Sequence, residues 1–116
     1  MMNEEALQAC INQHLEHAAM VRVLDDELGT HHGLLWADFV LLTMLEAVGG
    51  TAPTSELAYT LSTPPSRLLQ RLLPLEKIGL VQRTVDDEGR RNVTLRPQAR
   101  RRLHEARETA ANVCTR

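Results

Sequence analysis

Four polar side chains near the middle of the chain have the types and spacing to read nucleic acid. Arg67, Gln70 and Arg71 lie three and one residues apart, and Ser66 comes directly before them. In the major groove an arginine guanidinium can bind guanine O6 and N7, and a glutamine amide can pair with adenine. Because leucines occupy the inward side of this helical segment, we expect the four polar side chains to face outward, toward base edges. The alternative is an ordinary solvated helix face.

A second basic pair follows a polar turn. Residues 80–85 and 91–95 each alternate between apolar and polar side chains, and the run Asp86-Asp87-Glu88-Gly89 separates them. This pattern predicts a β-hairpin with its tip in solvent. Beside a reading helix, such a hairpin can reach the DNA backbone or the minor groove. The hairpin therefore predicts a second DNA contact beside the helix.

Charge is divided unevenly along the chain. The formal net charge is −2, but residues 1–66 hold nine acidic residues and one base, whereas residues 67–107 hold eleven bases and five acids. A basic half on an acidic protein favours phosphate contact from one face. The alternative is a composition effect, because arginine outnumbers lysine twelve to one.

The sequence gives weaker support for metal, redox or catalytic sites. His14 and His17 can share a helix face, but a zinc site needs a third and fourth ligand, so we expect solvated or interface histidines and no metal. Cys10 falls on the apolar side of the first predicted helix, where a buried, unactivated thiol is the expectation and an oxidant sensor the alternative. No nucleotide-binding loop, nucleophile elbow or paired carboxylates occur, so we expect neither catalysis nor a cofactor.

Helical spacing predicts most of the elements that would position these residues. The first helix covers residues 4–28, is capped by Asn3 and stops at Gly29-Thr30, and a second, buried helix covers 34–48. A short helix follows, capped by Thr54 or Ser55. Another begins at Pro64-Pro65 and ends at Gly79, with Pro74 expected to kink it. Its expected core residues are Leu68, Leu72, Leu75 and Ile78.

A last helix from Pro97 toward Val113 completes the series. The elements predict a mainly α chain with a small β-hairpin, which is a winged helix-turn-helix. We expect one domain over 1–116, with an N-terminal dimerisation helix over 1–30, a winged core over 34–95 and a C-terminal helix over 97–114. Shared burial of apolar side chains on the two flanking helices would form a homodimer. The predicted interface residues are Leu7, Ile11, Leu15, Leu103, Ala110 and Val113.

Residues 34 to about 103 resemble the multiple-antibiotic-resistance regulator (MarR) family of bacterial repressors. The resemblance rests on residues 55–58 (Ser-Glu-Leu-Ala), 75–83 (Leu-Glu-Lys-Ile-Gly-Leu-Val-Gln-Arg) and 86–91. It implies a dimer whose recognition helices enter the major groove and whose wings enter the minor groove. It also implies release of DNA when a small-molecule effector, oxidant or metal arrives.

The chain departs from this family at three places. The usual wing reads Asp-x-Arg-Asp-x-Arg; Asp86 and Arg91 match it, but Glu88 replaces a base and Gly89 an acid. The resemblance therefore implies that Arg90 and Arg91 contact DNA, with Arg90 at the tip and Glu88 weakening the local attraction. Residues 95–99 lack the hydroxyl residue that usually caps the next helix. The chain has a single helix after the hairpin, whereas the family normally adds a second one for dimerisation. If the chain dimerises, the first and last helices should supply most of the interface.

The leading prediction is therefore a sequence-specific regulator, more specifically a repressor, that binds double-stranded DNA as a homodimer and responds to a small-molecule effector. One alternative is a winged-helix protein that acts through protein contacts. Another is a metal- or redox-responsive sensor. No apolar run reaches the roughly 20 residues that span a bilayer, and the first thirty residues lack the order of a signal peptide. With only two cysteines, we expect a cytoplasmic protein without a membrane partner.

Overall fold

A computed structural model describes residues 1–116. The chain forms two compact units, one of residues Ala37–Glu105 and one of Met1–Trp36 with Ala106–Arg116. The elements, in chain order, are α1 (Glu4–His32), α2 (Trp36–Ala47), β1 (Thr51–Pro53), α3 (Thr54–Thr60), α4 (Pro65–Lys77), β2 (Val81–Val85), β3 (Arg91–Leu95) and α5 (Pro97–Cys114). This confirms the predicted mainly helical winged helix-turn-helix with its β-hairpin.

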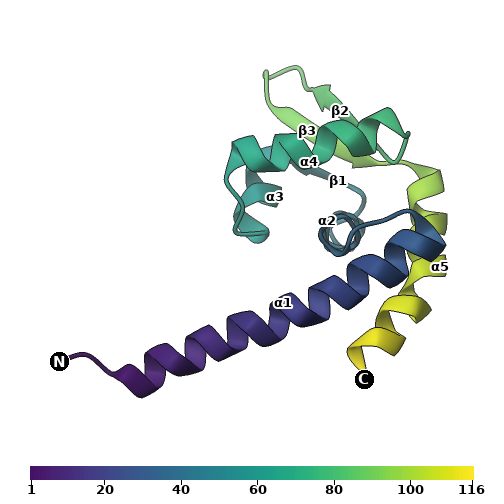
Figure 1. Ribbon diagram of the computed structural model, residues 1–116. Helices are drawn as coiled ribbons and strands as arrows, with labels where there is room; N and C mark the ends of the chain where they lie inside the picture. Colours follow the sequence, from purple (N-terminus) through teal and green to yellow (C-terminus); the bar gives the residue numbers. More distant parts are fainter. The chain divides into compact units, whose positions relative to one another are not determined.

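The unit of residues 37–105 joins α2, α3 and α4 to a three-stranded antiparallel sheet of order β1-β3-β2. In the hairpin, Val81 pairs with Leu95 and Val85 with Arg91. Val93 and Leu95 of β3 are buried, two residues apart, because successive strand side chains point to opposite faces. In Figure 1, α4 lies alongside the β2–β3 hairpin. The strand β1, which no periodic signal predicted, pairs with β3 on the other edge.

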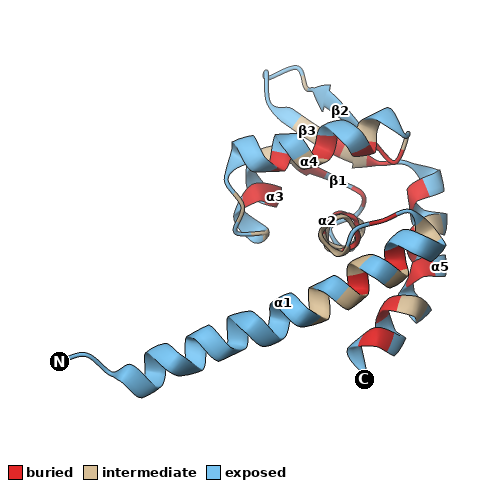
Figure 2. Cartoon of the chain, viewed as in Figure 1, coloured by how far each residue is buried: buried red, intermediate tan, exposed pale blue.

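The core of this unit consists mostly of aliphatic residues from its helices and sheet, and Figure 2 colours the buried residues red. Each such side chain contributes about 1.5–3 kcal/mol when fully buried. The fully buried ones include Leu41, Leu42, Leu45, Leu68, Leu72, Leu80, Val81, Val93 and Leu103. Ile78, which was predicted for the core, is 51% exposed. That prediction was wrong because α4 ends at Lys77, so Ile78 is the C-cap and no longer follows the helical spacing.

The second unit contains α1 and the end of α5. His32 Nε2 lies 2.8 Å from Thr109 Oγ1, and Arg116 pairs with Glu27 at 3.7 Å. Leu24 and Leu28 are buried, whereas residues 1–19 are all exposed. Cys10 is among the exposed residues, so the expectation of a buried thiol was wrong for the single chain.

Three of the predicted dimer residues are buried inside the chain itself. Leu103, Ala110 and Val113 are 0%, 4% and 1% exposed. They are therefore not available to a second copy, and their assignment to an interface was wrong. The apolar face of α5 is covered by the chain's own residues, which the spacing of a single helix does not reveal.

The helix ends partly follow the predicted caps. Asn3 caps α1 as expected, its Oδ1 accepting from the Ala6 N–H at 2.9 Å. However, α1 continues through Gly29 to His32, because the left-handed C-cap is Gly33 at φ 65°. Neither Thr54 nor Ser55 caps α3, since both lie inside its first turn. α4 runs unbroken through Pro74 to Lys77.

Candidate nucleic-acid interface

The helix α4 separates a buried stripe from an outward face. Leu68, Leu72 and Leu75 are 1%, 1% and 3% exposed, so the predicted inward positions are confirmed. Ser66, Arg67 and Gln70 are exposed and Arg71 is half-buried. The four predicted readers therefore lie on the sides of α4 that the core leaves open.

Helical geometry divides this outward face into three rows. At about 100° per residue, side chains four apart lie above one another. One row contains Arg67 and Arg71, and the opposite row contains Leu69 and Leu73. Ser66 and Gln70 lie between them, with Lys77 further along. A cationic row and an apolar row thus flank a polar centre.

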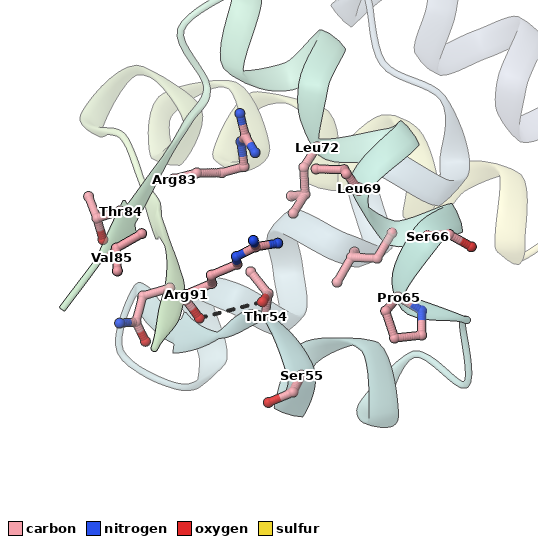
Figure 3. A pocket seen from close by; sticks show the side chains of 12 residues that line it. Thr54, Ser55, Pro65, Ser66, Leu69, Leu72, Arg83, Thr84, Val85 and Arg91 are labelled. Atoms are coloured by element: carbon pink, nitrogen blue, oxygen red, sulfur yellow. Dashed lines mark hydrogen bonds between the residues drawn. The ribbon is translucent and has the colours of Figure 1, made fainter. Parts of the chain in front are cut away.

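A groove of about 690 Å³ runs between α4 and the hairpin. Figure 3 shows Arg83 and Arg91 extending from the hairpin strands toward α4, with Leu69 and Leu72 on the helix side. The lining residues are Thr54, Ser55, Pro65, Ser66, Leu68, Leu69, Leu72, Arg83, Thr84, Val85, Arg91 and Asn92. Of the predicted site residues, Ser66 and Arg91 therefore share one groove.

Arg83 was missed by the sequence reasoning. Its Nε donates to Glu76 Oε1 at 2.9 Å and its backbone N–H donates to Glu76 Oε2 at 3.1 Å. These two hydrogen bonds, the backbone one first, lower the pKa of Glu76. The pair ties the base of the hairpin to α4 and so fixes one wall of the groove. The alternation of β2 was the available signal, because it places Arg83 on the same face as Val81 and Val85 and opposite to its adjacent residues.

Arg91 has its charge available. It makes no ion pair, and its backbone carbonyl accepts from Thr54 Oγ1 at 3.4 Å, so α3 and β3 meet beside it (Figure 3). Strand β3 begins at Arg91, opposite Val85 of β2. The backbone of Arg91 is therefore fixed by two elements of the same unit, and its side chain lines the groove.

Asp86 organises the hairpin tip. Its Oδ1 accepts the N–H groups of Glu88 and Arg90, both at 2.9 Å, and its Oδ2 accepts from Asn92 at 3.3 Å. The hydrogen bond from Arg90 is the main cause that lowers the pKa of Asp86. Gly89 adopts φ 80°, a left-handed conformation that favours glycine.

Arg90 is exposed at this tip but has acidic neighbours. Its Nε lies 3.4 Å from Asp86 Oδ2 and 3.8 Å from Glu88 Oε2. Its side chain is 64% exposed, so these pairs are screened by solvent. The tip therefore presents a cation whose field is partly cancelled, and Arg91 is the stronger anion-binding group of the predicted pair.

The other sequence candidates do not assemble into a site. His14 and His17 are exposed on α1, and no three histidine, cysteine, aspartate or glutamate side chains come together as ligands for a metal ion. Cys10 and Cys114 are both free and exposed thiols. None of the helices has the length and apolar character needed to cross a membrane.

The fold and this groove define a winged helix-turn-helix. No family model and no curated protein sequence matches the chain. Its fold does match solved structures of other proteins. The transcriptional regulator BldR from Sulfolobus solfataricus is 24% identical with a TM-score of 0.85, covering 98% of this chain and 83% of its own.

Two further structures show the same likeness. The MarR family regulator Sco3205 from Streptomyces coelicolor, in complex with DNA, is 20% identical with a TM-score of 0.86, covering 98% of this chain and 73% of its own. The organohalide-sensing regulator RdhR-CbdbA1625, in its 2,4-dichlorophenol-bound form, is 23% identical with a TM-score of 0.81. The match covers 97% of this chain and 67% of the regulator's own. The chain thus has the fold of MarR family transcriptional regulators.

Proposed function

We propose that this chain is a cytoplasmic transcriptional regulator of the MarR family that binds double-stranded DNA as a homodimer. The observation that carries the proposal is the arrangement of α4 and the hairpin in one unit. Arg67 and Gln70 are exposed on the outward face of α4, and the groove between this helix and the hairpin is lined by Ser66 of α4 and by the unpaired Arg91 of β3. A helix of this kind fits the major groove, and an adjacent hairpin can reach the backbone or minor groove.

The comparison with Sco3205 supports the same output, because that protein is described in complex with DNA. We propose more specifically that the protein is a repressor, which occupies its operator and blocks transcription. Release by a small molecule is supported by the dichlorophenol-bound neighbour and by a groove whose volume lies in the range of small-ligand sites. A ligand seated there would compete with DNA for Arg91.

A homodimer is supported by the state of α1. Its residues 4–19 are exposed, and an isolated helix of that length is marginal in water. Leu7, Ile11 and Leu15 recur every four residues and are 53%, 43% and 59% exposed. A second copy that packs on this row would bury side chains that the chain alone leaves in solvent.

The DNA-binding test is a salt titration with random duplex DNA. We expect log K to fall steeply and linearly with log salt, because phosphate contacts release counterions. Arg67→Ala and Arg71→Ala should weaken binding, while Arg22→Ala on α1 serves as a charge-matched control. DNA binding that neither of these two α4 variants alters would reject the proposed surface.

The dimer test uses sedimentation at micromolar concentration. Wild type should sediment as a dimer, and Ile11→Glu should sediment as a monomer because a charge is placed in the row. Glu16→Gln on the same helix is the control. A monomeric wild type would contradict the homodimer but leave DNA binding by a single winged unit open to the titration above.

One observation favours a second candidate, a winged-helix protein that acts through protein contacts. Glu88 and Asp86 partly cancel the charge of Arg90 at the tip. The titration separates the two functions, because a protein-contact module would bind duplex DNA weakly or not at all even at low salt.

A further inference from the structure

Two leucines on α4 are not used by the core. Leu69 and Leu73 are 39% and 45% exposed and lie four residues apart, on the flank of α4 opposite Arg67. Leu68, Leu72 and Leu75 already fill the buried stripe of the same helix. The exposed pair therefore forms an apolar row beside the polar and cationic residues of the same helix.

The surroundings of this row indicate what can cover it. Gln70 lies beside it, and the cations Arg67 and Lys77 are exposed on the same helix. The one acidic side chain of α4, Glu76, is hydrogen-bonded to Arg83. A surface that combines cations, an amide and an apolar row suits a polyanion that also displays apolar groups, more than it suits an entirely apolar partner.

Double-stranded DNA has this chemistry. In the major groove the apolar group on a base edge is the 5-methyl of thymine, and the bidentate partner of a glutamine amide is adenine. A thymine–adenine pair presents its methyl group and the adenine N6 and N7 atoms in the same groove. Gln70 lies three residues before Leu73, so their side chains are neighbours on the helix surface, and one stretch of α4 matches both features.

We infer that the row of Leu69 and Leu73 contacts thymine 5-methyl groups, so that the bound sequence carries thymine–adenine pairs where α4 enters the major groove. The inference rests on the proposed DNA-binding function and adds its base preference. Leu69 lines the groove beside the hairpin, so its thymine lies on the wing side of the contacted base pairs.

The experiment changes only the DNA methyl groups. Duplexes that bind are selected from a random pool, and each thymine in the enriched sequence is then replaced singly by deoxyuridine. Burying a methyl group stabilises a complex enough for about a fourfold change in affinity. We expect one or two thymines in each half-site to show a loss of about this size, and the others to show none.

Protein variants identify the contacting side chains. Leu69→Ala and Leu73→Ala should remove the discrimination between thymine and deoxyuridine at their own positions, while binding to random DNA keeps its salt dependence. Val48→Ala is the matched control, because Val48 is 59% exposed in the same unit but lies outside the groove. Both leucines are partly in solvent, and thermal unfolding checks that each variant remains folded.

The outcomes separate the two levels of the argument. Wild-type protein that binds selected duplexes with no loss at any deoxyuridine overturns the thymine inference and leaves the DNA-binding function standing. Loss that persists unchanged in both leucine variants also overturns it, since other side chains would then contact the methyl groups. Failure to bind any duplex at low salt contradicts the proposed function as well.

Discussion

Replacing Arg91 by alanine tests the groove most sharply. Arg91 makes no ion pair, begins β3, and directs its guanidinium into the space between the hairpin and α4 (Figure 3). Its loss removes one cation from each wing without removing a buried side chain, because Arg91 is exposed. The protein should therefore fold normally and lose affinity for DNA.

The size of the expected change in the salt dependence of DNA binding follows from counterion release. Each phosphate contact contributes about 0.9 to the slope of log K against log salt on duplex DNA. A dimer that loses two such contacts should have a slope smaller in magnitude by about 1.8. The fall in affinity between about 50 and 200 mM salt should then be roughly tenfold smaller than for wild type.

The assay is fluorescence anisotropy of a labelled duplex over that salt range. Arg91→Lys keeps the charge and should keep most of the slope, whereas Arg22→Ala should change neither slope nor affinity. An Arg91→Ala slope equal to that of wild type would refute the assignment of Arg91 to a phosphate. A reduced slope in Arg22→Ala would show that total charge, not the groove, controls binding.

Three other predictions follow from the hairpin and the core. Glu88→Gln should strengthen DNA binding about two- to fivefold at low salt by releasing Arg90, the range expected of an exposed ion pair; weaker or unchanged binding in the anisotropy assay would contradict this. The lowered pKa of Asp86 gives stability that is full above its ordinary value of 3.8 and declines as pH falls through the folded value. Asp86→Asn should therefore lose less Tm than wild type on acidification below about pH 4, and parallel curves would exclude that role. Leu72→Ala should cost about 2–5 kcal/mol in a urea titration, but Leu73→Ala less than about 0.5 kcal/mol; equal losses would contradict the assigned faces.

Long periodic elements could be predicted because burial imposes a period on the sequence. The stripe of Leu68, Leu72 and Leu75 marks both the helix and its inward face. The hairpin followed from a period of two on each side of a polar turn. By contrast, β1 has three residues, Thr51–Pro53, too few for any period to appear.

The errors have one physical cause, which is that a local pattern shows an apolar face but not what covers it. The apolar side of α5 was assigned to a dimer, yet Ala110 and Val113 are covered within the chain. Cys10, on the apolar side of α1, was expected to be buried, yet it is exposed in the single chain. Which segment covers an apolar helix face depends on tertiary packing, and the residue spacing within one helix does not show it.

The candidate site was predictable in part for a related reason. Outward positions follow from inward ones, so Arg67 and Gln70 could be placed on the open face of α4. Ion pairs depend on which elements meet in space. The sequence therefore does not show that Arg83 is held by Glu76, or that Arg90 has two acidic neighbours.

The most direct test of the central claim is amide hydrogen exchange of the whole protein with and without duplex DNA. Exchange reports protection segment by segment, so it locates the bound surface without any substitution. DNA should slow exchange in residues 65–77 and 86–91 and leave residues 4–19 unchanged. Protection confined to residues 4–19, or no protection at a DNA concentration that saturates binding, would contradict the placement of α4 and the hairpin on the double helix.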